Sequence, residues 1–191
     1  MDSDIPRLHQ VLSGQTKHLF NLMDAMQNGA FWNLIQHHGY PTPLLDWSYS
    51  PFVAAFFAYR NKALDDKKAP YVRIYMFDRQ AWCEDFGQLG KIAPAMPHFS
   101  ILEPLALENS RLIPQQALSS VTNLDDIETY LRQREQDKGK TYLSAFDLPA
   151  TDMNAALSEL IMMGISAGSL FPGLDGACEE WHYRNFGYQP S

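Results

Sequence analysis

The chain has 191 residues, of which 46% are hydrophobic and 13% aromatic, and it carries a formal net charge of −7. This composition can bury one sizeable core, which indicates one domain and excludes general disorder. The negative charge argues against non-specific nucleic-acid binding, because such binding usually depends on a basic surface.

The sequence shows no sign of membrane insertion or export. Its longest unbroken apolar run, residues 52–59, is much shorter than a membrane-spanning helix, and residues 1–10 lack the basic start and apolar stretch of a signal peptide. Only Cys83 and Cys178 are present, which is typical of a reducing compartment. We therefore expect a soluble, cytoplasmic protein with no membrane partner.

The first third of the chain is predicted to be helical. Apolar residues at three- and four-residue spacing predict a helical hairpin over residues 17–38, broken near Asn28 and Gly29. Another helix is expected from Pro51, because Ser50 is a favourable N-cap and proline suits a first helical turn. One face of that helix carries apolar residues and should be buried. These residues are Phe52, Ala55, Phe56 and Tyr59.

Strands and helices follow in alternation. Residues 71–77 alternate in polarity and are rich in β-forming residues, which predicts a strand. Short strands are expected near residues 99–103 and 115–121. The later predictions are a charged helix over 124–136, a strand over 141–148, a helix capped by Thr151 or Asp152 and running through Met163, and a last helix that follows a turn at 171–176 and runs through Arg184.

Together these elements predict a single α+β domain, with a small mixed or antiparallel β-sheet packed against helices. We divide it into an N-terminal helical segment, residues 1–30, and an α+β domain, residues 31–191.

Standard catalytic and metal-binding motifs are absent from the sequence. It contains no G-x-G-x-x-G, G-x-x-x-x-G-K-[ST], H-E-x-x-H or G-x-S-x-G pattern. His37 and His38 are adjacent, so their side chains diverge in a helix or a strand and suit joint metal ligation poorly. We expect no metal.

Residues 36–50 nevertheless concentrate polar side chains directly before an apolar helix. Each residue alone has a structural explanation, since aspartate often caps a helix and tryptophan often fills a core. Their concentration indicates a site, and we predict that the loop from His37 to Ser50 faces the segment from Arg111 to Gln116 across one cleft. At least one side chain of the first segment should hydrogen-bond to one of the second, either directly or through one water. The candidates in the first segment are His37, His38 and Asp46, and those in the second are Arg111, Gln115 and Gln116.

Residues 36–58, QHHGYPTPLLDWSYSPFVAAFFA, resemble the signature of the FRG-domain family, which is QHHG-x-P-T-R-L-L-D-W-T followed by a helix of small and aromatic residues. Two weaker matches follow in the family's order. Residues 109–116 resemble its R-I-x-x-Q-x-G segment, and residues 164–176 resemble its closing G-I-x4-L-F-P-x-L-D-G segment. The resemblance covers the chain from Phe31 to Gly176.

The chain departs from the family pattern at three places. No Phe-Arg-Gly, the motif that names the family, precedes residue 36. Pro43 stands where arginine is usual, and Ala117 stands where glycine is usual. We interpret the chain as a shortened or diverged member.

The order of the family's motifs is similar to that of ADP-ribosyltransferases, which implies a fold of that type and NAD as cofactor. In those enzymes the first motif holds NAD, the second shapes the nicotinamide pocket, and an acidic or polar third motif stabilises an oxocarbenium-like transition state. Ser48 and Ser50 resemble the second motif. Gln115 and Gln116 stand at the third, although glutamine lacks the negative charge that would stabilise a developing cation.

One hypothesis is therefore a nucleotide- or NAD-using enzyme domain. In it, His38 and Thr42 position phosphate or ribose, Asp46 orients a histidine, and Arg111 pairs with phosphate. Ser48 or Ser50 lines the base pocket. The catalytic candidates are His38, Asp46, Gln115 and Gln116, and the ligand-binding candidates are His37, Thr42, Ser48, Ser50 and Arg111.

The other hypothesis is a non-catalytic module that binds a small ligand or a protein target. The same polar residues then hold a rigid loop, and the missing Phe-Arg-Gly and acidic third motif are expected. Both hypotheses include a toxin or phage-defence role.

Overall fold

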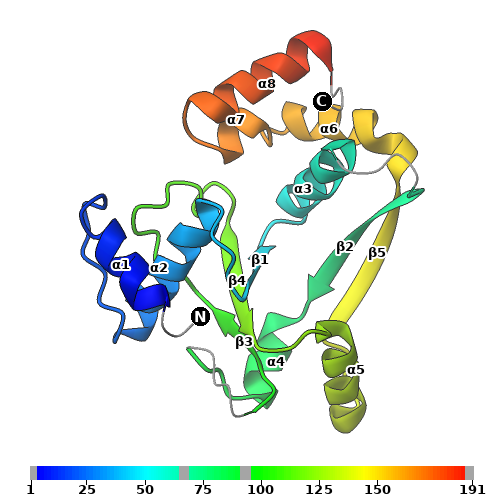
Figure 1. Ribbon diagram of the computed structural model, residues 1–191. Helices are drawn as coiled ribbons and strands as arrows, with labels where there is room; N and C mark the ends of the chain where they lie inside the picture. Colours follow the sequence, from blue (N-terminus) through cyan, green and yellow to red (C-terminus); the bar gives the residue numbers. More distant parts are fainter. Residues whose placement is uncertain (1–3, 65–68, 91–95, 188–191) are drawn as a thin grey trace.

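The computed structural model describes residues 4–64, 69–90 and 96–187. Within them, the strands form a three-stranded antiparallel sheet in the order β1-β4-β3 and an antiparallel pair, β2-β5 (Figure 1). The predicted α+β class with antiparallel sheets is confirmed. The strands are β1 (Leu44–Ser48), β2 (Tyr71–Phe77), β3 (Phe99–Leu102), β4 (Ala117–Thr122) and β5 (Leu143–Pro149).

The helices lie in three groups around these sheets (Figure 1). One group is α1 (Asp4–Leu12) with α2 (Ala25–His37), and another is α4 (Arg79–Asp85) with α5 (Ile127–Lys138). The third group, at the opposite end of the molecule from α4 and α5, packs around α3. It comprises α3 (Pro51–Leu64), the 3-10 helix η1 (Ala150–Asp152), α6 (Met153–Met162), α7 (Ala167–Leu170) and α8 (Leu174–Phe186).

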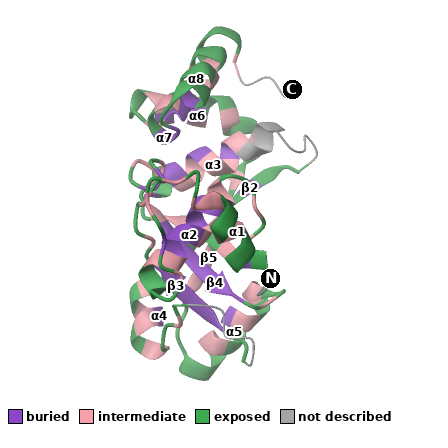
Figure 2. Ribbon diagram, turned by 60° about the vertical axis from the view of Figure 1, so that its left-hand side comes forward, coloured by how far each residue is buried: buried purple, intermediate pink, exposed green. Residues whose placement is uncertain are grey.

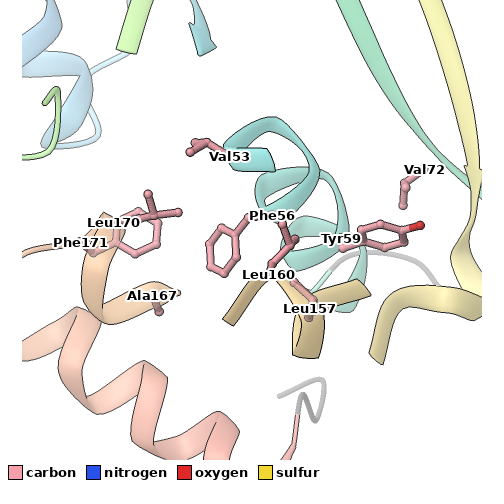
Figure 3. Close-up of a cluster of buried hydrophobic side chains, with 9 residues drawn as sticks. All are labelled: Val53, Phe56, Tyr59, Val72, Leu157, Leu160, Ala167, Leu170 and Phe171. Atoms are coloured by element: carbon pink, nitrogen blue, oxygen red, sulfur yellow. The ribbon is translucent and has the colours of Figure 1, made fainter. Parts of the chain in front are cut away.

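Each helical group has its own buried cluster, and buried residues also run along β3 and β4 (Figure 2). The cluster around α3 joins that helix to β2, α6 and α7 (Figure 3). A second cluster joins α1 to α2. The third surrounds Trp82 and Tyr142 and includes residues of β3, β4 and α5.

The predicted hairpin over residues 17–38 is wrong in its first half. Helix α2 begins only after Asp24, whose Oδ1 accepts a hydrogen bond from the Gln27 backbone N–H at 2.9 Å. The helix continues through Gly29, where a Cβ would lie 2.9 Å from the Leu102 side chain, so the glycine permits close packing and causes no break. Helix α1 lies within the predicted N-terminal helical segment, although its own bounds were not predicted. Helix α2 also runs across residue 30, where the sequence analysis separated a helical segment from the α+β domain. That division stays a prediction.

Helix α3 begins at Pro51, as predicted, and the Ser50 hydroxyl accepts a hydrogen bond from the Val53 N–H at 3.3 Å. Phe56 and Tyr59 are buried, with exposed fractions of 0% and 4%. Phe52 is 51% exposed, so its predicted burial is wrong. The buried stripe runs through Val53, Phe56 and Tyr59, which places Phe52 to one side of the packed face.

The four predicted strands are confirmed as β2, β3, β4 and β5, with small shifts of some of their ends. Asp126 caps α5, so this helix begins later than predicted, and Gly139 ends it in the left-handed conformation. Tyr142 precedes β5 and is buried against Trp82. Helix α7 was not predicted. It is a single turn closed by reciprocal hydrogen bonds between Ser166 and Ser169.

Candidate functional site

A cleft of about 530 Å³ is lined by residues of α2, β1, α3 and β2, by the loop before β4 with the first residue of that strand, and by Phe171. Both polar segments predicted from the sequence contribute to it. Its lining includes aromatic and aliphatic residues of α3 and β2 and polar residues of the two segments. Its polar and charged residues include His37, Asp46, Arg73, Tyr75, Arg111 and Gln115.

Pairing between β1 and β4 brings the two segments together. Residues 44–48 were expected in a loop but form β1, in which Asp46 lies opposite Ser119 and Ser48 lies opposite Ala117. Residues 45–48 all line the cleft, and Asp46 and Ser48 share one face of the strand because they are two residues apart. The Ser48 hydroxyl donates to the Gln115 carbonyl at 2.8 Å, which fixes the second segment beside the first.

A short chain of hydrogen bonds orients Asp46. The Thr42 hydroxyl donates to Gln36 Oε1, and Gln36 Nε2 donates to Asp46 Oδ1 at 2.8 Å. Because the Gln36 oxygen is already an acceptor, its amide presents a donor to Asp46. Gln36 is therefore a hydrogen-bond partner of Asp46, whereas the sequence analysis predicted that Asp46 orients a histidine.

The cleft also changes the acidity of Asp46. Asp46 is exposed to solvent, but the surrounding protein displaces much of the water near its carboxyl group. This partial desolvation raises the pKa of Asp46. The hydrogen bond from Gln36 opposes this effect, because it stabilises the ionised form. Among the described residues that line the cleft, Asp46 alone carries a carboxyl group.

The two histidines at the end of α2 have different environments. His37 lines the cleft, and partial burial, the positive charge of Arg111 and the neighbouring His38 all lower the pKa of His37. It is therefore neutral near pH 7. His38 is exposed, is not among the residues that line the cleft, and closes α2 with its backbone N–H. In the described part of the chain, no group of three His, Cys, Asp or Glu side chains could hold a metal ion.

Arg111 also lines the cleft, close enough for its charge to act on His37. Its backbone N–H donates to Asn109 Oδ1 at 3.2 Å, and its guanidinium carbon lies 5.1 Å from the centre of the Phe171 ring. In residues 4–64, 69–90 and 96–187, no carboxylate forms an ion pair with Arg111. Its charge is therefore available to a ligand.

The remaining candidates have structural contacts. Gln115 lines the cleft, but its Nε2 donates to the Leu170 carbonyl at 3.0 Å. Ser50 caps α3, and Gln116 is exposed with a φ of +48°. The structure thus brings one group of predicted residues to the cleft lining and leaves another outside it. At the lining are His37, Asp46, Ser48, Arg111 and Gln115, and outside it are His38, Thr42, Ser50 and Gln116.

Several lining residues were not predicted from the sequence. Gln36, Asn109 and Phe171 lie inside the family-like motifs, which is a signal that could have found them. Arg73 and Tyr75 share one face of β2 and line the same cleft. Arg73 is neutralised by Asp147, with Nη2 to Oδ2 at 2.7 Å, and the Tyr75 hydroxyl donates to Glu128 at 2.6 Å.

The fold and the cleft define an α+β domain in which two separated motifs line one ligand-sized cleft. Residues 6–67 match the family model of the FRG domain, which supports the assignment to the FRG-domain family that the motifs predicted. The match covers most of α1 and all of α2, β1 and α3. Searches of curated proteins and of solved structures give no match to the chain. Every helix in the described residues is too short or too polar to cross a bilayer.

Proposed function

We propose that this FRG domain binds a nucleotide in the cleft, with NAD as the cofactor to be tested first. The observation that carries the proposal is the Arg111 guanidinium, which lines the cleft and has no carboxylate partner among the described residues. A guanidinium stays charged at all relevant pH values and binds phosphate oxygens through two parallel hydrogen bonds.

The rest of the cleft suits the other parts of a nucleotide. Trp47, Phe57 and Tyr75 offer aromatic surface to a base, whereas Asp46 offers an acceptor to a ribose hydroxyl. A volume of about 530 Å³ lies within the range of small-molecule sites, roughly 300–1,000 Å³. Neutral His37 adds no charge, so Arg111 supplies the main attraction for phosphate.

A second proposal adds chemistry to this binding, as in ADP-ribosyltransferases. A carboxylate beside the ribose could stabilise the positive charge that develops when the nicotinamide–ribose bond breaks. Nicotinamide leaves with the bonding electron pair, and water or an acceptor hydroxyl forms the new bond to the ribose carbon and loses its proton. Asp46 supports this proposal because it is the carboxylate among the described lining residues.

Binding is tested by isothermal titration of the purified chain with NAD, ADP and adenosine. We expect NAD and ADP to bind at least about tenfold more tightly than adenosine, which lacks the phosphates that Arg111 would contact. An Arg7→Ala variant removes an exposed arginine of α1 that does not line the cleft and should bind as the wild type does. Equal affinities for ADP and adenosine, or no binding of any of the three compounds, would contradict the proposal.

Cleavage is tested by measuring nicotinamide release from NAD with and without cell extract. An NAD-cleaving enzyme should release nicotinamide, and Asp46→Asn should reduce the rate at least about tenfold, because it removes the charge while keeping the shape. Tight binding of NAD without release would instead support the non-catalytic module and reject the enzyme.

A further inference from the structure

We infer that Phe171 is a positioning residue whose ring holds the Arg111 guanidinium at the cleft. Phe171 belongs to the closing family-like motif, residues 164–176, and Arg111 to the motif at residues 109–116. The closing motif would then position a side chain of the motif at 109–116. The inference rests on the proposed function for its effect on ligand binding, but the placement of Arg111 can be tested without a ligand.

The ring of Phe171 lies between the core and the cleft. It is 9% exposed and belongs to the buried cluster around α3, in which Phe56 and Leu170 also lie (Figure 3). Its centre is 5.8 Å from the ring centre of Phe57, in an edge-to-face arrangement. The same ring lines the cleft and lies 5.1 Å from the Arg111 guanidinium carbon.

The position of this ring is fixed from several sides. Arg60, on α3, has its guanidinium carbon 4.9 Å from the ring centre. Arg60 also donates to both carboxylate oxygens of Glu179 on α8, with Nη2 to Oε2 at 2.9 Å. The ring therefore lies where α3 is joined to α8.

The backbone around Phe171 is equally constrained. The Leu170 carbonyl accepts a hydrogen bond from Gln115 Nε2 at 3.0 Å, which joins this turn to the segment that carries Arg111. A Cβ on Gly176 would lie 2.0 Å from the Phe171 carbonyl oxygen, so only glycine allows α8 to pack this closely. The turn thus presents the ring to Arg111 in one orientation.

A cation is attracted to the face of an aromatic ring, and the attraction is larger where water is partly excluded. Arg111 has no carboxylate partner among the described residues, and the Phe171 ring beside its guanidinium restricts its rotamers. Without the ring, the side chain would have to be ordered when a ligand binds, which lowers affinity.

The first test compares Phe171→Leu with Phe171→Tyr. Leucine keeps an apolar side chain but has no aromatic face, whereas tyrosine keeps the face. We expect Phe171→Leu to weaken ADP binding about tenfold and Phe171→Tyr to stay within about twofold of the wild type. Thermal unfolding of both variants checks that each is folded at the temperature of the titration.

The second test follows the titration of His37 by NMR in the absence of ligand. Besides partial burial, which is the largest cause, the groups that lower the pKa of His37 are Arg111 and the adjacent His38. If Phe171 holds Arg111 near His37, Phe171→Leu should raise the pKa of His37 toward the value in Arg111→Gln, and Phe171→Tyr should leave it unchanged. A loss of packing alone would lower stability without this selective change.

The outcomes separate the two proposals. If the wild type binds no nucleotide, the proposed function fails, whereas the His37 titration still decides the role of Phe171. If Phe171→Leu leaves both the ADP affinity and the His37 pKa at their wild-type values, Phe171 is a core residue and nothing more.

Discussion

Replacing Phe56 by alanine should lower the free energy of unfolding by about 3–5 kcal/mol, the range observed for buried phenylalanines. Phe56 has an exposed fraction of 0% and lies in the cluster that joins α3 to α6 and α7. Its ring centre is 5.8 Å from that of Phe57 and 6.4 Å from that of Phe171. Removal of the ring would leave a cavity that these neighbours can fill only in part.

The measurement is urea denaturation followed by circular dichroism, with Phe52→Ala as the matched control. Phe52 lies on the same helix but is 51% exposed, so its replacement should cost less than about 1 kcal/mol. A loss of similar size in both variants would contradict the burial that the structure assigns. A loss below about 1 kcal/mol for Phe56→Ala would do so as well.

The different environments of Phe52 and Phe56 show what periodicity can predict. Helical spacing located α3 and its start at Pro51, because a cap, a first-turn proline and repeated apolar residues agree there. It did not distinguish Phe52 from Val53 as the first buried residue. That choice depends on where α6 and α7 cover the helix, which is a tertiary property.

Strand β1 was missed for a related reason. Its sequence, LLDWS, does not alternate between polar and apolar residues, and its pairing partner β4 lies about 70 residues further along the chain. The order of the motifs nevertheless predicted that the two polar segments share a cleft, and the lining confirms that both contribute to it.

The direction of individual side chains could not be predicted from motif membership. His38 and Gln116 belong to the motifs yet lie outside the cleft lining, because α2 ends at His37 and Gln116 adopts a positive φ of +48°. Arg73 and Tyr75 belong to no motif yet line the cleft. The sequence therefore predicted which segments line the candidate cleft better than it predicted which side chains do.

Arg111→Gln should weaken ADP binding about 100-fold, the largest effect that we expect of any cleft substitution. Glutamine keeps hydrogen-bonding capacity and part of the side-chain length but loses the charge and the paired donors that match phosphate oxygens. The effect should be large because no described carboxylate already satisfies the guanidinium. Isothermal titration at low and at high salt measures it, and the loss should be smaller at high salt because ions screen the charge of the wild type.

Arg73→Gln provides the control within the same cleft. Arg73 also lines the cavity, but Asp147 holds its guanidinium in a two-point ion pair, with Nε to Oδ1 at 2.6 Å and Nη2 to Oδ2 at 2.7 Å. A ligand phosphate would have to compete with that carboxylate, so this substitution should change ADP affinity by no more than about fivefold. If Arg73→Gln abolished binding while Arg111→Gln preserved it, the phosphate would lie against β2, and the assignment of Arg111 as the phosphate-binding residue would be wrong.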